Sequence, residues 1–190
     1  MKMIHLRRGA GLTLAVGAIT IGALVAATPS SAAISPFAAQ ARAAGLNAAQ
    51  IAQLQREVAG YVAETGGRQV SANKVVFVGG DVTVAIPGQR YAYDLAGGVV
   101  PNTWPTCYYG DLCAYSGENG TGTKKSYYIC QDAQPFTSGY GSFDNNQTTG
   151  TKAYFYRWRD GGGTSLAYTS IAHDRVSSWN WTITADVRTC

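Results

Sequence analysis

A repeated aromatic and glycine pattern in the second half of the chain constrains its fold more than any other feature. Tyr115-Ser-Gly-Glu-Asn-Gly120-Thr-Gly122 and Tyr156-Arg-Trp-Arg-Asp-Gly161-Gly-Gly163 both read Tyr-x4-Gly-x-Gly, and the two tyrosines lie 41 residues apart. Each copy precedes a strand-like run and then a polar segment, 145–150 in the first copy and 173–178 in the second. An internal repeat of this length predicts one supersecondary unit that is used twice.

Residues 1–33 have the pattern of a secretory signal peptide. Three basic residues begin the chain, an apolar run covers 10–27, and the small residues of 29–33 follow. A membrane anchor is the alternative, because about 18 apolar residues can just span a bilayer. The small residues at the end of the run favour cleavage, so we expect a secreted, extracellular protein without stable membrane insertion.

The net charge of the chain comes mostly from this leader. The full sequence has 15 Lys+Arg and 11 Asp+Glu, and Lys2, Arg7 and Arg8 lie in the first 33 residues. The remainder therefore has 12 basic and 11 acidic residues. This balance argues against a nucleic-acid partner, which would need a basic surface.

Four cysteines follow the leader, at positions 107, 113, 130 and 190. An even number in an exported chain predicts two disulfides, for which three connectivities exist. We favour Cys107–Cys113 as a local loop and Cys130–Cys190 as a fastener of the C-terminus. Cysteine ligation of a metal is disfavoured, because no Cys-x-x-Cys pair occurs and His173 is the one histidine after the leader.

Residues 34–100 are predicted to form a small extension with a linker. Asn47 and Gln50 predict a capping box at the start of a helix that ends at Gly66. Two strands are expected next, 74–78 and 82–86, with a turn at 79–81. A unit of this size seldom folds firmly alone, so it is either a removable pro-segment or a lid that packs permanently on the next domain.

Residues 101–190 are predicted to form an all-β domain. The region is rich in Gly, Tyr, Trp, Thr and Ser, a composition typical of short strands joined by turns. Strands are expected at 111–116, 124–130, 151–158, 165–169 and 180–188. In the last strand we expect Ile183, Ala185 and Val187 to point inward and Thr184 outward.

Taken together, the repeats resemble a βγ-crystallin Greek-key domain. Each motif of that family opens with an aromatic residue and a hairpin glycine, and later carries Asn/Asp-Asn/Asp-x-x-Ser/Thr-Ser. Tyr115 with Gly122 and Tyr156 with Gly163 match the opening. The resemblance covers about 80 residues and implies a βγ-crystallin-like double Greek-key sandwich, here preceded by the helix-plus-hairpin extension.

Within that fold, the segment Cys107-Tyr-Tyr-Gly-Asp-Leu-Cys113-Ala-Tyr115 is similar to the opening of a bacterial metalloproteinase-inhibitor family. The resemblance implies a secreted peptidase inhibitor that acts on an extracellular peptidase. We expect it to act by steric occlusion, as a monomer and without a required cofactor. One departure is that the characterised inhibitor offers a Cys-Val bond, and no Cys-Val dipeptide occurs here. A structural or calcium-binding crystallin-type module is the alternative, and an exported toxin is a third hypothesis.

The polar segments suggest a weak Ca²⁺ site under that alternative. Asn145, Asn146, Thr149, Asp174 and Ser177 offer the hard oxygen ligands that Ca²⁺ takes, although Asp174 is the one carboxylate among them. Local capping of turns explains the same residues. Enzyme activity is not expected, because a single histidine next to Asp174 and Ser177, without a nucleophile elbow, provides little acid–base chemistry.

Alignment of the two polar segments predicts about 13 extra residues in the first repeat, relative to the second, within 131–142. We expect this segment to form a loop that begins beside Cys130, is stiffened by Pro135, and presents Phe136 and Tyr140. Aromatic anchors on a disulfide-held loop suit a protease-blocking segment, because preorganisation lowers the entropy loss on binding. The alternative is an ordinary connection whose aromatic residues fold back onto the core.

Overall fold

The structure is a computed structural model that describes residues 36–97 and 100–190. The expected signal peptide lies outside the described residues. Two α-helices precede the strands, at α1 (Pro36–Ala43) and α2 (Ala48–Thr65). The strands of the first half are β1 (Arg68–Ser71), β2 (Lys74–Phe77), β3 (Gly80–Thr83), β4 (Asp111–Tyr115), β5 (Lys124–Tyr127) and β6 (Asp132–Ala133). The remaining strands are β7 (Tyr140–Asn146), β8 (Lys152–Trp158), β9 (Thr164–Ile171), β10 (Asp174–Asn180) and β11 (Thr184–Arg188).

Helix α2 begins and ends where the sequence predicts. The Asn47 side chain accepts a hydrogen bond from Gln50 N, and the Gln50 side chain accepts one from Asn47 N, each at 3.0 Å. Gly66 ends the helix with a φ of 64°, a left-handed conformation that suits glycine. The buried residues of the helix are Ile51, Leu54 and Val58. Leu54 and Val58 pack against the hairpin strands, and Ile51 packs with Ala41 and Ala72.

The hairpin is present, but its turn is tighter than predicted. Phe77 pairs with Gly80, so Val78 and Gly79 alone form the turn, and Gly80 and Asp81 already belong to β3. A further strand, β1, pairs with β2 and was not predicted. The short polar run of β1 lacks the alternation that would have indicated a strand.

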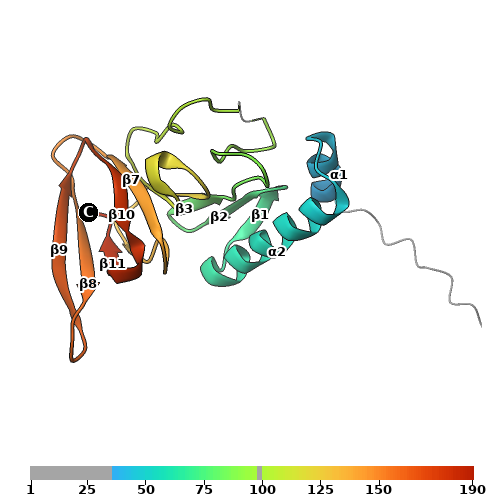
Figure 1. Ribbon diagram of the computed structural model, residues 1–190. Helices are drawn as coiled ribbons and strands as arrows, with labels where there is room; N and C mark the ends of the chain where they lie inside the picture. Colours follow the sequence, from blue (N-terminus) through green and yellow to red (C-terminus); the bar gives the residue numbers. More distant parts are fainter. Residues whose placement is uncertain (1–35, 98–99) are drawn as a thin grey trace, which may run out of the picture. The chain divides into compact units, whose positions relative to one another are not determined.

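The hairpin continues directly into the sheet of the C-terminal region. Strand β3 pairs antiparallel with β5, from Gly80 opposite Tyr127 to Thr83 opposite Lys124. The resulting sheet has seven strands in the order β1-β2-β3-β5-β4-β7-β10. Figure 1 shows β3 and β2 beside helix α2, so one sheet connects the extension to the repeats.

A second antiparallel sheet has four strands in the order β6-β11-β8-β9. Each repeat contributes four strands, β4 to β7 and β8 to β11, and the third strand of each lies in the sheet of the other repeat. Thus β6 pairs with β11, and β10 pairs with β7. The mostly β architecture with a small N-terminal helical part agrees with the predicted all-β class.

The predicted insertion in the first repeat is wrong. The second and fourth strands of each repeat are separated by twelve residues, 128–139 in the first and 172–183 in the second. The polar segments were not equivalent positions, because Asn145 lies in a fourth strand, whereas Asp174 begins a third strand. These two residues instead face each other as partners in adjacent strands.

The core between the two sheets is aromatic. Phe143 stacks on Phe155 with ring centroids 4.4 Å apart, and Trp181 is almost fully buried beside them. A 3₁₀ turn at Trp181–Ile183 changes the phase of the last predicted strand. As a result Ala185 and Val187 point inward as expected, but Ile183 is exposed and Thr184 is buried.

Candidate functional site

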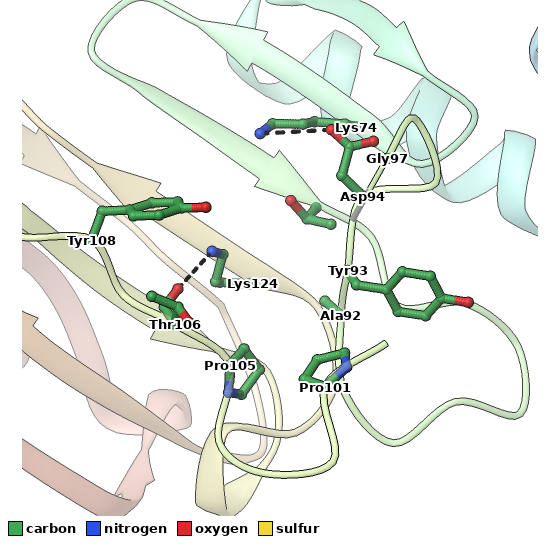
Figure 2. Close-up of a pocket in the computed structure, with 11 residues that line it drawn as sticks. Lys74, Ala92, Tyr93, Asp94, Gly97, Pro101, Pro105, Thr106, Tyr108 and Lys124 are labelled. Carbon is green, nitrogen blue, oxygen red and sulfur yellow. Dashed lines mark hydrogen bonds and ion pairs between the residues drawn. The ribbon is translucent and has the colours of Figure 1, made fainter. Parts of the chain in front are cut away.

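A polar pocket of about 360 Å³ is lined by residues from 92–97, from 101–108 and from strands β2, β3 and β5. Figure 2 shows the ammonium groups of Lys74 and Lys124 and the ring of Tyr108 around it. Lys74 Nζ lies 3.9 Å from Asp94 Oδ2, and Lys124 Nζ donates to the Thr106 carbonyl at 3.2 Å. The pocket can therefore hold a small polar group beside two cations and one carboxylate.

Burial shifts the ionisation of the groups beneath this pocket. It lowers the pKa of the Lys124 ammonium below its ordinary value. It also raises the pKa of the Asp81 carboxyl, against the attraction of Lys74 and Lys124. Asp81 Oδ1 is buried without a hydrogen-bond partner, which agrees with this direction. Lys124 and Asp81 are consequently only partly solvated.

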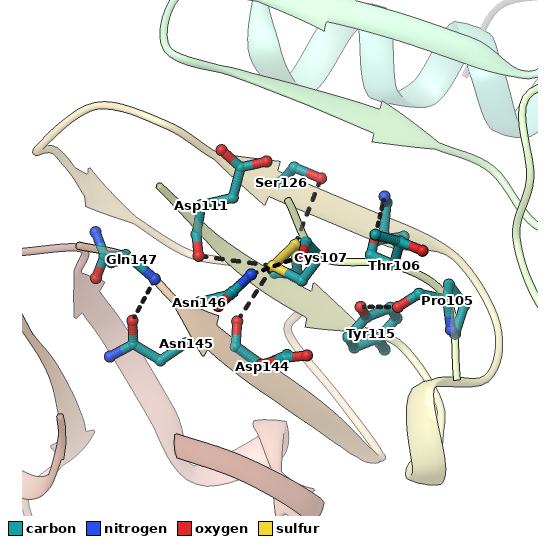
Figure 3. The surroundings of a disulfide bond; sticks show 12 residues. Pro105, Thr106, Cys107, Asp111, Tyr115, Ser126, Asp144, Asn145, Asn146 and Gln147 are labelled. Atoms are coloured by element: carbon teal, nitrogen blue, oxygen red, sulfur yellow. Dashed lines mark hydrogen bonds between the residues drawn. A yellow bond between two sulfur atoms is a disulfide. The ribbon is translucent and has the colours of Figure 1, made fainter. Parts of the chain in front are cut away.

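Beside the pocket, a disulfide closes a short loop. Cys107 and Cys113 are bonded with their Cα atoms 5.8 Å apart, and Cys130 is bonded to Cys190. Both pairs are those favoured from the sequence. Figure 3 shows the Cys107–Cys113 bond next to Asp111, Asp144 and Asn146, so the bridge fastens the loop to the middle of β4, beside β7.

Hydrogen bonds fix the backbone of this loop. Asp111 N donates to the Tyr108 carbonyl at 3.1 Å, which closes a turn, and Gly110 N donates to the Asn146 carbonyl at 2.8 Å. Asn146 Nδ2 in turn donates to the Cys107 carbonyl at 2.9 Å. Gly110 has a φ of 99°, which a side chain would resist. The loop is thus held by a covalent bond, a turn and one asparagine.

Two tyrosines project from the fixed loop into solvent. Tyr108 is 68% exposed and Tyr109 is 66% exposed. The Tyr109 ring lies 6.0 Å from the His173 ring, and Lys124 Nζ lies 5.8 Å from the centre of the Tyr108 ring. We call Tyr108 and Tyr109 the tyrosine pair. It forms the most exposed aromatic surface on a disulfide-closed segment of the described chain.

Further apolar side chains lie at the same end of the large sheet. One row of the sheet aligns Gly80, Tyr127, Leu112, Asn145 and Asp174 across five strands. The residues just beyond this row include Val78, Tyr128 and Ile129, all of which are exposed. The tyrosine pair therefore belongs to a wider apolar rim along one end of the sheet.

The predicted inhibitory loop is arranged differently from the expectation. Phe136 is only 9% exposed and packs on Trp181, with ring centroids 5.7 Å apart. Pro135 is buried as well, because the segment is held against the sheet by the pairing of β6 with β11. Tyr140 is 62% exposed, but it begins β7, the strand whose other end carries Asn146. Phe136 is thus a core residue, and the expectation that the loop presents it is wrong.

The predicted calcium ligands do not converge on one point. Asn145 is buried and its Nδ2 donates to the Ser170 carbonyl, and Asp174 Oδ2 accepts from the Tyr168 hydroxyl. The oxygens of Asn146 and Thr149 are both engaged by the ring nitrogens of His173, at 2.8 and 3.2 Å.

Ser177 is exposed and lies three residues further along β10 than Asp174. In the described part of the chain, no three His, Cys, Asp or Glu side chains are grouped as metal ligands.

The sequence does indicate the tyrosine pair, although the site predicted from it lay at 131–142. Two consecutive tyrosines lie between cysteines only six residues apart, so a Cys107–Cys113 bridge places both of them in a short closed loop. The contribution of Asn146 could not be read in the same way. Its role depends on strand β7, which lies 39 residues from Cys107 in the chain.

Comparisons with protein-family models, curated proteins and solved structures gave no match for this chain. Among the described residues, no helix has the length and apolar character needed to cross a membrane. The function of the chain is therefore inferred from the geometry of the site and from the resemblance of its motifs.

Proposed function

We propose that this chain is a secreted peptidase inhibitor that occupies the cleft of an extracellular peptidase with the tyrosine pair. The observation that carries the proposal is the combination of high exposure and a fixed backbone at Tyr108 and Tyr109. Tyrosine is enriched among the residues that dominate binding energy at interfaces. A loop that is already ordered loses less conformational entropy when it binds.

The inhibition would be steric and would need no chemistry by this chain. The Cys107–Cys113 bridge and the hydrogen bonds of Asn146 keep the loop in one conformation, so a peptidase could not easily draw it into a productive geometry. The pocket beside Tyr108 offers a polar complement to side chains of the partner. The site is thus moved from the predicted segment 131–142 to the segment 107–113.

The sheet topology supports the resemblance on which the peptidase assignment depends. In each repeat the fourth strand lies beside the first, as in a Greek key, while the third strand is exchanged into the other sheet. In this chain β6 and β10 are the exchanged strands. Gly120 and Gly122 lie in the hairpin of the first repeat with φ values of 74° and 77°, as the sharp turn of that motif demands.

The direct test is titration of a panel of secreted metallo-, serine and cysteine peptidases with the purified chain. We expect stoichiometric loss of activity at micromolar concentration for at least one enzyme, with the inhibitor recovered intact by mass spectrometry. If every enzyme in the panel keeps full activity, or if the chain is simply degraded, the proposal is overturned for these classes.

A further inference from the structure

The outer face of the four-stranded sheet carries a row of aromatic side chains along β8. Residues alternate across a strand, and Ala153 and Phe155 are fully buried in the core between the sheets. Tyr154, Tyr156 and Trp158 occupy the opposite face, where Trp158 is 59% exposed. Successive rings of this row are about 7 Å apart along the strand. We call these three residues the β8 row.

The rings of the β8 row stack on no other ring in the described part of the protein, although Arg188 interacts electrostatically with Tyr156. The core aromatics contact one another, as Phe155 contacts Trp179 at 5.0 Å. None of the three rings of the β8 row makes such a contact with another described ring, and neither tyrosine hydroxyl forms a hydrogen bond there. Trp158 is exposed and the two tyrosines are half-buried, so their outward ring faces and hydroxyl groups can meet a ligand.

Hydrogen-bonding side chains flank the row on both sides. Strand β11 places Arg188 opposite Tyr154 and Asp186 opposite Tyr156. Strand β9 places Thr169 opposite Tyr154 and Thr164 opposite Trp158. Lys152 and Arg188 on this face are matched by Asp132 and Asp186, and Arg188 Nε donates to Asp132 Oδ1 at 2.9 Å. At the Trp158 end, Arg157, Arg159 and Asp160 add one net positive charge.

A groove continues the row at one end. It has a volume of about 410 Å³, and Trp158, Arg159, Ser165 and Ile183 are among the residues that line it. Trp158 thus belongs both to the aromatic row and to a concave, polar surface. Single exposed aromatic residues are common on protein surfaces, whereas an aromatic row that continues into a polar groove is typical of a binding surface.

We infer that the β8 row and its groove bind a linear, uncharged polysaccharide. The apolar faces of pyranose rings stack on the aromatic row, and their hydroxyl groups bond to the flanking Arg, Asp and Thr side chains. A nucleic acid would need a strongly basic surface, whereas the row and its groove together have four cations and three carboxylates. An apolar protein surface would desolvate Arg188 and Asp186 without replacing their hydrogen bonds.

The inference is tested with the full secreted chain in depletion assays on insoluble cellulose and insoluble chitin, with single-stranded oligothymidine in a parallel solution assay. We expect depletion by at least one polysaccharide, and a loss of affinity of about tenfold or more in Trp158→Ala and in Tyr156→Ala. Tyr140→Ala is the matched control, since it removes an exposed aromatic from a strand of the other sheet.

Near- and far-ultraviolet circular dichroism checks that each variant is folded. The inference is overturned if neither polysaccharide depletes the chain, or if Trp158→Ala binds as the unmodified chain does. Binding to oligothymidine in preference to both polysaccharides would also overturn it. The β8 row and the tyrosine pair lie on different sheets. Peptidase inhibition is therefore measured for Trp158→Ala as well, and we expect this variant to inhibit as the unmodified chain does, so that failure of one proposal does not imply failure of the other.

Discussion

Lys125 Nζ lies 2.6 Å from Glu64 Oε1, and this ion pair joins helix α2 of the extension to strand β5 of the first repeat. The Lys125 side chain is only 4% exposed and also lies over the rings of Tyr61 and Phe136. Burial lowers the pKa of its ammonium group, so the charge depends on its partner. The extension therefore provides the anion that compensates a buried cation of the repeats.

Removal of that anion should destabilise the protein. Glu64→Gln leaves the Lys125 ammonium without its charged partner, and we expect a loss of about 1–2 kcal/mol in the free energy of unfolding. Lys125→Met should be neutral or mildly stabilising, because it replaces a buried charge with an apolar side chain of similar length. Urea unfolding of both single variants and the double variant measures the coupling. If Glu64→Gln has the same effect in the protein that already carries Lys125→Met, the pairing is contradicted.

Phe136 should behave as a core residue. We expect Phe136→Ala to lower the free energy of unfolding by about 3 kcal/mol, because it removes packing on Trp181. Phe136→Leu, which keeps most of the volume, should lose much less. Thermal unfolding compares the two variants. A Phe136→Ala protein of unchanged stability but reduced inhibition would restore the original hypothesis of an inhibitory loop at 131–142.

The two disulfides should contribute unequally to stability. Their sequence separations are 6 and 60 residues. On the chain-entropy model, replacement of both cysteines by alanine should remove about 2 kcal/mol for the 107–113 bridge and about 4 kcal/mol for the 130–190 bridge. Denaturant titration under oxidising conditions gives both values. Loss of the 107–113 bridge should cost less stability than loss of the 130–190 bridge but should weaken inhibition more. A larger loss of inhibition without the 130–190 bridge would contradict the proposed site.

Asp81 should make stability depend on pH in a defined direction. Because its folded-state pKa is raised, its protonated form stabilises the fold, and this contribution is present below the unfolded pKa and lost as pH rises through the folded pKa. Asp81→Asn should therefore raise the unfolding midpoint at pH 7 and have little effect near a pH of about 4. The exposed Asp160→Asn serves as the control. If Asp81→Asn destabilised the protein more at pH 7 than at pH 4, a raised folded-state pKa of Asp81 would be contradicted.

Local signals in the sequence predicted much of the fold. The capping box of Asn47 and Gln50 and the left-handed Gly66 depend on neighbouring residues alone, so helix α2 was predictable. Strands β7 and β10 were not, because their polar residues lack apolar alternation. The burial of polar residues in β7 depends on distant partners, such as Ser170 for Asn145 and Arg175 for Asp144, and β10 has no buried residue.

The candidate site was predictable only in part. The pairing of Cys107 with Cys113 followed from their spacing, but the exposure of Tyr108 and Tyr109 depends on which strands surround the loop. Phe136 shows the opposite case. A tertiary contact with Trp181 buries an aromatic residue that sequence reasoning placed on a loop surface.

Inhibition constants for three matched proteins test the central claim most directly: the unmodified chain, Tyr108→Ala/Tyr109→Ala and Tyr140→Ala, each against a peptidase that the unmodified chain inhibits. The tyrosine-pair variant should weaken inhibition about 30-fold or more, since truncation of interface anchors commonly costs about 2 kcal/mol or more. Tyr140→Ala should inhibit as the unmodified chain does. Full inhibition by the tyrosine-pair variant, or selective loss in Tyr140→Ala, would contradict the account.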